Sequence, residues 1–290
     1  MAHSPETGTP LIDMQGVDKQ FGNGTVAVRD MSLTIQQGEF VSFLGPSGCG
    51  KSTALKMISG LLSVSAGSIT VNGHRPGEGN AGSDIGYVFQ EATLMPWATV
   101  YENVYLPLKL QGVGKVEGRA RVEEALSMVG LANFAKSYPR ELSGGMKMRV
   151  SIARAMVTKP KLLLMDEPFA ALDEMSRTKL NDEVLSLWKS LGLTVIFVTH
   201  SVFESVSLSS RVVVMAARPG RVVHDIALTG GYPRNAAYRM SPEYAESCRA
   251  VSKSANAASA GCSISCRLPP SPLPLGCGNS WSGTTRCRIT

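Results

Sequence analysis

The sequence lacks the features that mark membrane-spanning and secreted proteins. Apolar runs such as residues 162–165 and 212–217 are far shorter than the roughly 20 residues needed to cross a bilayer. Residues 1–10 are polar, with no basic segment followed by an apolar one, so no secretory signal is predicted. With 290 residues, 43% of them hydrophobic, the chain is long enough to bury a full core. We therefore expect a globular protein located in the cytosol.

Cysteine is scarce where the sequence is patterned. Of the six cysteines, only Cys49 precedes Cys248, so no disulfide framework is expected for the core. The cysteines after residue 260 lack the paired C-x-x-C spacing of structural zinc sites, and zinc is not expected there. These cysteines are Cys262, Cys266, Cys277 and Cys287.

Acidic residues are absent after Glu246. Five of the 29 basic residues lie beyond it, leaving 24 basic against 23 acidic residues in the rest of the chain. The formal charge of +6 therefore resides mainly at the C-terminal end, and the nearly neutral body argues against a nucleic-acid partner. Residues 255–290 are rich in Ser, Gly, Pro and Cys without periodicity, which predicts a disordered tail. A natural disordered end and an out-of-frame reading of the gene both fit this composition.

Hydrophobic periodicity predicts an α/β fold. Residues 11–35 contain short segments rich in Val, Ile, Leu and Thr, broken by Gly and Asn, as in antiparallel strands joined by turns. Farther along, uniformly apolar strands alternate with helical patterns, which favours a largely parallel sheet covered on both faces. Strands are predicted at 39–44, 67–72, 85–89, 161–165 and 193–199, with a closing hairpin at 211–216 and 221–228. Helices are predicted at 54–62, 101–111, 118–129, 143–158 and 174–191.

Residues 45–52 match the phosphate loop G-x-x-x-x-G-K-[ST] and lie between a predicted strand and a predicted helix, as that motif requires. The glycines let backbone N–H groups wrap phosphates, and the helix N-terminus adds partial positive charge. Lys51 would neutralise β- and γ-phosphate oxygens, and the Ser52 hydroxyl would ligate magnesium. A Gly-rich turn without a ligand is the alternative. The predicted nucleotide-binding residues here are Gly45, Pro46, Ser47, Gly48, Cys49, Gly50, Lys51, Ser52 and Thr53.

The apolar run at residues 162–165 ends in two carboxylates, Asp166 and Glu167. Ligands of open α/β sheets bind beyond the carboxyl ends of the strands, where these residues would lie. Asp166 is predicted to hold magnesium, directly or through water, and Glu167 to polarise the attacking water as a general base. Taken alone, the pattern equally fits a strand followed by a helix cap. The phosphate loop upstream favours the catalytic interpretation.

Residues 142–146, L-S-G-G-M, begin a long predicted helix with Ser and two glycines, which makes a second anion-binding helix terminus. The segment resembles the LSGGQ signature of ATP-binding-cassette ATPases, with Met146 in place of Gln, and the resemblance covers roughly residues 11–228. Without the other motifs, Ser-Gly-Gly would be an ordinary helix N-cap. The resemblance implies a P-loop NTPase (RecA-like) fold: a parallel sheet core, an antiparallel β subdomain and an inserted α-helical subdomain. It also implies nucleotide contacts from Ser143, Gly144 and Gly145.

Further residues gain roles only through this resemblance. Phe21 corresponds to the aromatic that stacks on adenine, and Gln90 to the glutamine that contacts magnesium and senses the permease. Asp173 belongs to the loop that crosses to a partner subunit, and His200 matches the switch histidine that contacts the γ-phosphate. The next residue is Ser201, where relatives usually carry an acid. The expected catalytic set is Glu167, His200, Lys51 and Gln90, and the expected metal ligands are Ser52, Gln90 and Asp166.

Cys49 lies inside the phosphate loop near a helix N-terminus, an environment that lowers the pKa of a thiol. The favoured interpretation is nevertheless a small residue that fills space. If the thiol were reactive, its alkylation should block nucleotide binding.

The resemblance also implies partners. Two copies would pair head to tail, with ATP binding closing the dimer and hydrolysis resetting it. Residues 88–104 and 217–221 are similar to the importer branch for nitrate, sulfonate and taurine. That branch adds an integral membrane permease and an extracytoplasmic solute-binding protein. We therefore expect ATP and Mg²⁺ as ligands, and a peripheral location at the cytoplasmic face of the inner membrane.

Four segments describe the expected organisation. An ATPase domain covers residues 11–230 with a helical subdomain at about 91–140 inserted, followed by a C-terminal extension at 231–254 and the tail at 255–290.

A soluble cassette ATPase acting on nucleic acid or ribosomes is one rival function, opposed by the balanced core charge and the lack of a tandem cassette or a long heptad insert. A P-loop kinase is the other, opposed by the L-S-G-G segment and the Asp-Glu pair.

Overall fold

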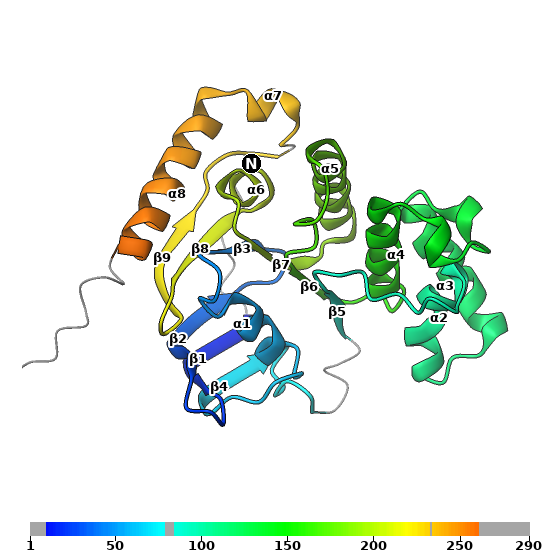
Figure 1. Cartoon of the computed structure of the whole chain (residues 1–290), viewed down its shortest axis with the longest axis horizontal. Coiled ribbons are helices and arrows are strands. Elements are labelled where there is room, and N and C mark those ends of the chain that lie inside the picture. The colour runs from blue at the N-terminus through cyan, green and yellow to red at the C-terminus, as the bar shows by residue number, and fades with distance from the viewer. Residues whose placement is uncertain (1–9, 79–83, 233, 261–290) are drawn as a thin grey trace, which may run out of the picture.

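The computed structural model describes residues 10–78, 84–232 and 234–260. Figure 1 shows a small sheet, a larger sheet beside it, and a group of helices at one end of the larger sheet. Within these residues, no helix combines the length and the apolar character needed to cross a bilayer. The arrangement agrees with the predicted α/β architecture, in which antiparallel and helical parts flank a mainly parallel sheet.

The small sheet is antiparallel, as the pattern in residues 11–35 predicted. Buried side chains alternate along β1 (Ile12–Gln20) on either side of a register shift between Met14 and Val17, because successive residues of a strand point to opposite faces. In spatial order the strands are β2 (Val26–Ile35), β1 (Ile12–Gln20) and β4 (Ala66–Val71).

The larger sheet orders its strands differently from the chain. In spatial order they are β5 (Ile85–Val88), β6 (Leu162–Asp166), β7 (Thr194–Thr199), β3 (Phe40–Leu44), β8 (Arg211–Ala216) and β9 (Arg221–Ala227). Neighbours from β5 to β8 pair in parallel, and only β8 and β9 pair antiparallel. Every residue of β3, β6 and β7 is buried, because both faces of these central strands are covered. The strand bounds differ from the predicted ones by no more than one residue.

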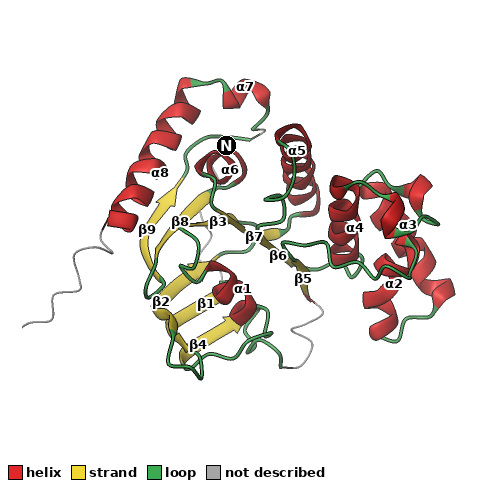
Figure 2. Cartoon of the chain, viewed as in Figure 1, coloured by secondary structure: helices red, strands yellow, loops and turns green. Residues whose placement is uncertain are grey.

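Helices lie on both faces of the larger sheet and beyond its β5 end (Figure 2). They are α1 (Lys51–Ile58), α2 (Val100–Leu110), α3 (Lys115–Met128), α4 (Gly144–Met156), α5 (Glu174–Leu191), α6 (Val202–Leu208), α7 (Ala236–Arg239) and α8 (Pro242–Ala260). Val41 and Phe43 of β3 join the core beneath α1 and the small sheet. Phe40 of the same strand joins the opposite core, together with residues of α4 and α5. Leu44 of β3 belongs to a third buried cluster, so this one strand contributes side chains to three clusters.

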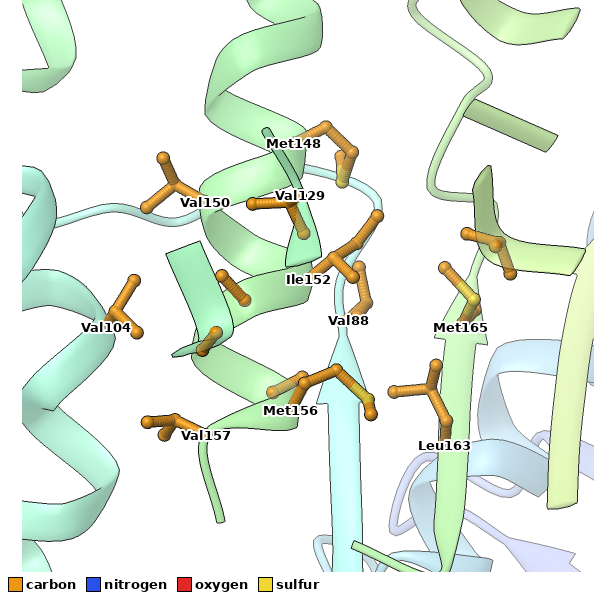
Figure 3. Packing of buried hydrophobic residues seen from close by; sticks show 14 of the residues in the cluster. Val88, Val104, Val129, Met148, Val150, Ile152, Met156, Val157, Leu163 and Met165 are labelled. Carbon is orange, nitrogen blue, oxygen red and sulfur yellow. The ribbon is translucent and has the colours of Figure 1, made fainter. Parts of the chain in front are cut away.

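The inserted helical subdomain is attached to the sheet through α4. Figure 3 shows Ile152 and Met156 of α4 on the side of that helix that faces Val88 of β5. All three belong to one buried cluster that also includes Val104 of α2 and Val122 of α3. The helical subdomain and the sheet therefore share a continuous apolar core, which orients the start of α4 relative to the strand ends.

The C-terminal extension differs from its prediction. Helix α8 continues to Ala260, whereas disorder was predicted from residue 255. Cys248, Val251 and Ala258 are buried in a cluster that includes residues of β8, so the apolar face of α8 packs on the sheet. The sequence pattern did not predict this helix, because the buried residues on its apolar face are few and small. Residues 261–290, with the cysteines considered for zinc, lie outside the described residues.

Candidate functional site

The phosphate-loop segment connects β3 to α1 and lies against β2 and β8. Gly50 is the N-cap of α1, with a φ of 90° in the left-handed region that favours glycine. A Cβ atom on Gly50 would lie 2.8 Å from the carbonyl oxygen of Ala27, and one on Gly45 would lie 2.4 Å from that of Met215. These two glycines are therefore required by backbone geometry and close packing. The resulting loop ends at a helix N-terminus, which is suited to anions.

Lys51 lies buried under this loop, with only 4% of its surface exposed. Its ammonium donates hydrogen bonds to the carbonyl oxygens of Gly45 at 2.8 Å and Pro46 at 3.1 Å. The cation is also 3.8 Å from Oε1 of Glu167. A buried cation with three donor hydrogens, held by neutral carbonyls and one carboxylate, can exchange a carbonyl for a phosphate oxygen.

Ser52 and Asp166 bring two oxygen ligands together. The Ser52 hydroxyl donates to Oδ1 of Asp166 at 2.7 Å, which joins the first turn of α1 to the end of β6. The Tyr87 hydroxyl lies 3.4 Å from Oδ2 of Asp166. Burial, and then the charge of Asp166, raise the pKa of Tyr87, so its hydroxyl stays protonated. A carboxylate beside a hydroxyl is the hard oxygen environment that Mg²⁺ prefers, so these residues fit the expected metal.

Glu167 directly follows Asp166 in the chain, and its φ of 47° is unusual for a residue with a side chain. Its backbone N–H donates to the carbonyl of Val198 on the neighbouring strand at 3.1 Å. This geometry places the carboxylate between Lys51 and His200, whose Nδ1 lies 3.6 Å from Oε2 of Glu167. Strained backbone conformations of this kind concentrate at functional sites.

The parallel sheet explains why these residues meet. Leu44 pairs with Thr199, and Asp166 pairs with Val198, so β3, β6 and β7 end at the same level. The residues that follow those strands therefore share one edge. The structure brings together Lys51, Ser52, Asp166, Glu167 and His200 from segments far apart in the sequence.

Other expected residues lie outside this cluster. Ser143 is the N-cap of α4 and accepts a hydrogen bond from the N–H of Met146 at 3.3 Å, while its side chain remains exposed. Asp173 likewise caps α5, accepting from the N–H of Ser176 at 2.9 Å. This hydrogen bond lowers the pKa of the Asp173 carboxyl. Both cap residues face solvent within the single chain.

The remaining expected contacts lie around the edge. Phe21 follows β1, is 40% exposed, and has the Lys19 ammonium 5.6 Å from its ring centre. Gln90 is exposed two residues after the end of β5. Met146, the departure from the signature pattern, packs against the core shared by α4 and the sheet.

Cys49 does not have the environment of a reactive thiol. It is fully buried, and its sulfur is 3.8 Å from the Lys51 ammonium. Burial raises the pKa of Cys49 despite the opposing attraction of Lys51. The alternative of a reactive thiol, whose pKa the helix N-terminus would lower, is not supported, because desolvation of the thiolate outweighs that effect. The sulfur packs in the core beneath α1, as the space-filling interpretation predicted.

The sequence reasoning missed two polar residues behind this edge, Arg177 and Glu204. Arg177 donates to the carbonyl of Leu172 at 3.0 Å, and Glu204 accepts from the Thr199 hydroxyl at 2.6 Å. A signal for Glu204 was available, because Ser201 and Glu204 have the S-x-x-E spacing of a helix N-terminus. The Ser201 hydroxyl indeed accepts from the N–H of Glu204 at 3.3 Å. No comparable short motif marks Arg177.

Known proteins match most of the chain. The family model described as ABC transporter matches residues 28–170. The nitrate import ATP-binding protein NrtD of Synechocystis sp. is 42% identical over 237 residues, covering 80% of this chain and 88% of the relative. The taurine import ATP-binding protein TauB of Rhizobium johnstonii is 47% identical over 204 residues, with 70% and 77% covered. The aliphatic sulfonates import ATP-binding protein SsuB of Bacillus licheniformis is 43% identical over 230 residues, with 78% and 87% covered.

A solved structure matches the fold as well. It is a dimeric post-hydrolysis state of the ATP-binding cassette MJ0796, bound to ADP and Pi. The TM-score is 0.68 at 34% sequence identity, and the match covers 76% of this chain and 100% of that chain.

Proposed function

Because the chain belongs to the ABC transporter family, we propose that it binds and hydrolyses ATP to drive import of a small anion, such as nitrate, a sulfonate or taurine, through a separate permease. The observation that carries this proposal is the meeting of Lys51, Asp166 and Glu167 beside a phosphate-loop helix terminus. Relatives named for the import of these solutes support the transport role. They favour it over the alternative of a soluble cassette ATPase acting on nucleic acid or ribosomes.

The nucleotide would be held by residues 45–53, with Phe21 stacking on the adenine. Lys51 would turn from its own loop carbonyls to the β- and γ-phosphates, keeping its charge compensated throughout. Ser52 and Asp166 would hold Mg²⁺, with Gln90 completing the set from the neighbouring strand end. A bound Mg²⁺ neutralises charge that develops on the phosphates.

Glu167 would act as the general base. Its carboxylate lies 3.8 Å from the Lys51 ammonium and 3.6 Å from Nδ1 of His200, and its backbone conformation fixes the direction in which it points. It would take a proton from the attacking water, while His200 donates a hydrogen bond to the γ-phosphate. Because His200 is 61% exposed, its ring is free to reach a nucleotide at the mouth of the site.

A second copy would complete the site. Within one chain the helix terminus formed by Ser143, Gly144 and Gly145 is separate from the Lys51 cluster and partly exposed, so it is available to another chain. Asp173 is exposed on the adjacent loop, and a Cβ on Gly144 would lie 3.6 Å from Leu172 of that loop. The dimeric form of the matched cassette supports pairing of two copies, which we propose to be head to tail.

The helical subdomain would dock the permease. Trp97 precedes α2 with 77% of its surface exposed. It lines an open cavity of ≈ 300 Å³ together with Met95 and Tyr105. The protein would thus sit peripherally at the cytoplasmic face of the inner membrane. An extracytoplasmic solute-binding protein would deliver the solute and never contact this chain.

Uptake in cells tests this function. We would delete the gene, restore it as wild type or as Glu167→Gln, and measure uptake of labelled nitrate, taurine and an alkanesulfonate. Loss of uptake of one anion on deletion, restored by the wild type and not by the variant, is expected. Unchanged uptake of all three, together with co-purification of RNA in place of a membrane protein, would favour the nucleic-acid alternative.

A further inference from the structure

Arg177 and Glu204 have no role in the proposed catalysis. They lie between the loop at residues 169–173 and the turn that carries His200. Arg177 is in the first turn of α5, directly after the loop at residues 169–173 that ends at Asp173. Glu204 is in the first turn of α6, directly after the turn that carries His200. Helices α5 and α6 are close neighbours in Figure 1 and contact each other.

Arg177 fastens the loop to α5. Its Nη2 donates to the carbonyl of Leu172 at 3.0 Å, and its Nε donates to the carbonyl of Phe169 at 3.3 Å. Nη1 contacts the carboxylate of Glu174, also at 3.3 Å. The flat guanidinium thus spans both ends of the 169–172 segment, which a smaller or apolar side chain could not do. The position of the loop therefore depends on the position of this guanidinium.

Glu204 fastens the turn of the switch histidine to α6. Its Oε2 accepts from the Thr199 hydroxyl at 2.6 Å, and that hydroxyl oxygen accepts from the N–H of Ser201 at 2.9 Å. The Ser201 hydroxyl accepts in turn from the N–H of Glu204 at 3.3 Å. These three bonds join Thr199 and Ser201, which flank His200 in the chain, to Glu204, so the Glu204 carboxylate helps to fix the turn that carries His200.

Arg177 and Glu204 also lie close to each other. Oε1 of Glu204 is 3.9 Å from Nε of Arg177 and 3.5 Å from the amide nitrogen of Asn181, one turn farther along α5. The Glu204 side chain is only 14% exposed and that of Arg177 26%, so solvent screens this pair less than a surface ion pair. Both residues line a cavity of about 10 Å³ that Glu167 and His200 also line.

We propose that Arg177 and Glu204 are positioning residues that link the 169–173 loop to the turn carrying His200. A displacement of the loop by a partner subunit would move the guanidinium, and the guanidinium would move the carboxylate that holds Thr199 and His200. The loop and the histidine turn would therefore respond together to dimer closure. This inference rests on the proposed ATPase function for its consequence, although the link itself is a property of the single chain.

Three variants of the purified full-length protein test the link: Arg177→Met, Glu204→Gln and the double variant. Glu204→Gln keeps the volume and an acceptor for Thr199 but removes the charge next to Arg177, so it should fold. We expect each single change to lower kcat by about tenfold, because displacement of a reacting group by a fraction of an ångström to one ångström costs rate. Affinity of the monomer for ATP should stay unchanged. The double variant should lose little more than either single one.

The His200 imidazole provides a readout that does not depend on turnover. We would label histidine, assign the His200 resonance by its loss in His200→Gln, and record its chemical shift in each variant. Arg177→Met should shift that resonance, although Arg177 contacts neither His200 nor Thr199. Arg177→Lys should give a resonance between those of the wild type and of Arg177→Met. An unshifted resonance, or losses in kcat that multiply in the double variant, would overturn the link.

A control is the Arg211–Asp225 pair between β8 and β9, in which Arg211 is partly buried and Asp225 is exposed. Asp225→Asn should lower the thermal midpoint without changing kcat or the His200 resonance. The outcomes also separate this inference from the proposed function. A wild-type protein without ATPase activity would refute the proposed function, and the histidine spectrum would still decide whether the link exists.

Discussion

At the scale of single residues, Glu167 has the most constrained position in the proposed site. Its left-handed backbone, its hydrogen bond to Val198 and its place between Lys51 and His200 leave one direction for the carboxylate. The sequence predicted Glu167 as a site residue, because it belongs to a pair of acids that follows an apolar run. Its contacts were not, because they depend on how β3, β6 and β7 align.

The variant Glu167→Gln should bind ATP and lose hydrolysis by a factor of about 10² or more, since an amide cannot accept the proton of the attacking water. The direct measurement is single-turnover ATP hydrolysis beside equilibrium binding of ATP. Lys51→Ala is the informative control, because it should weaken binding itself. Unimpaired hydrolysis in Glu167→Gln would remove Glu167 from its role.

The Cys49 thiol should react slowly with alkylating reagents near neutral pH. Its raised pKa means that the thiolate fraction is smaller than for an exposed cysteine, and the fraction grows as the pH rises toward and past that pKa. Peptide mapping by mass spectrometry after timed alkylation would measure the rate at Cys49 separately from the other cysteines. The same chain unfolded in urea should react much faster, and a fast reaction in the folded chain would contradict the burial.

At the scale of secondary-structure elements, the sequence predicted most strands and long helices because their apolar spacing is strong. Helix α5 was predicted with the bounds that the structure has. Helices α6 and α7 are too short for periodicity to detect, and α8 hides its buried face among small residues. These elements are stabilised by tertiary packing and by their caps, which local patterns describe poorly.

Helix α2 offers a test of capping. The Thr99 hydroxyl accepts from the N–H of Glu102 at 3.2 Å, and the Glu102 carboxylate accepts from the N–H of Thr99 at 2.8 Å. Thr99→Ala should lower the free energy of unfolding by about 1 kcal/mol, with ATPase activity of the isolated subunit retained. Urea unfolding followed by circular dichroism would measure the loss.

The same cap should depend on pH. Hydrogen bonds from Thr99 lower the pKa of Glu102 in the folded chain, so its stabilising effect is present above the ordinary glutamate pKa and is lost as the pH falls through the folded value. The difference between wild type and Thr99→Ala should therefore shrink in acid. A difference that stays constant across that range would show that the carboxylate does not contribute.

At the scale of the whole molecule, we propose that the site is divided between the two halves of a dimer. The helix terminus at Ser143 is exposed in the single chain and does not join the Lys51 cluster. This separation is expected if the Ser143 side of one copy closes over the nucleotide held by another. The shared core between α4 and the sheet would keep the two surfaces at a fixed spacing within each copy.

The variant Ser143→Arg should still bind ATP as a monomer and should fail to dimerise, because a long cation would occupy the position of the γ-phosphate contact. Size-exclusion chromatography with ATP, in the Glu167→Gln background that blocks hydrolysis, would compare dimer with monomer. Ser143→Ala should reduce dimerisation less. Loss of ATP binding to the monomer in Ser143→Arg would argue against a site made by two chains.

The amino-acid sequence by itself determined the α/β class, most element bounds and the chemical groups of the proposed site, because short motifs and apolar periodicity are local properties. Only the tertiary structure decided which of those groups meet. It aligned the ends of β3, β6 and β7, buried Cys49 deeply enough to raise its pKa, and set Arg177 against Glu204 from different helices. Such contacts depend on how strands order themselves in a sheet and how helices pack across it, and no window of sequence contains both partners.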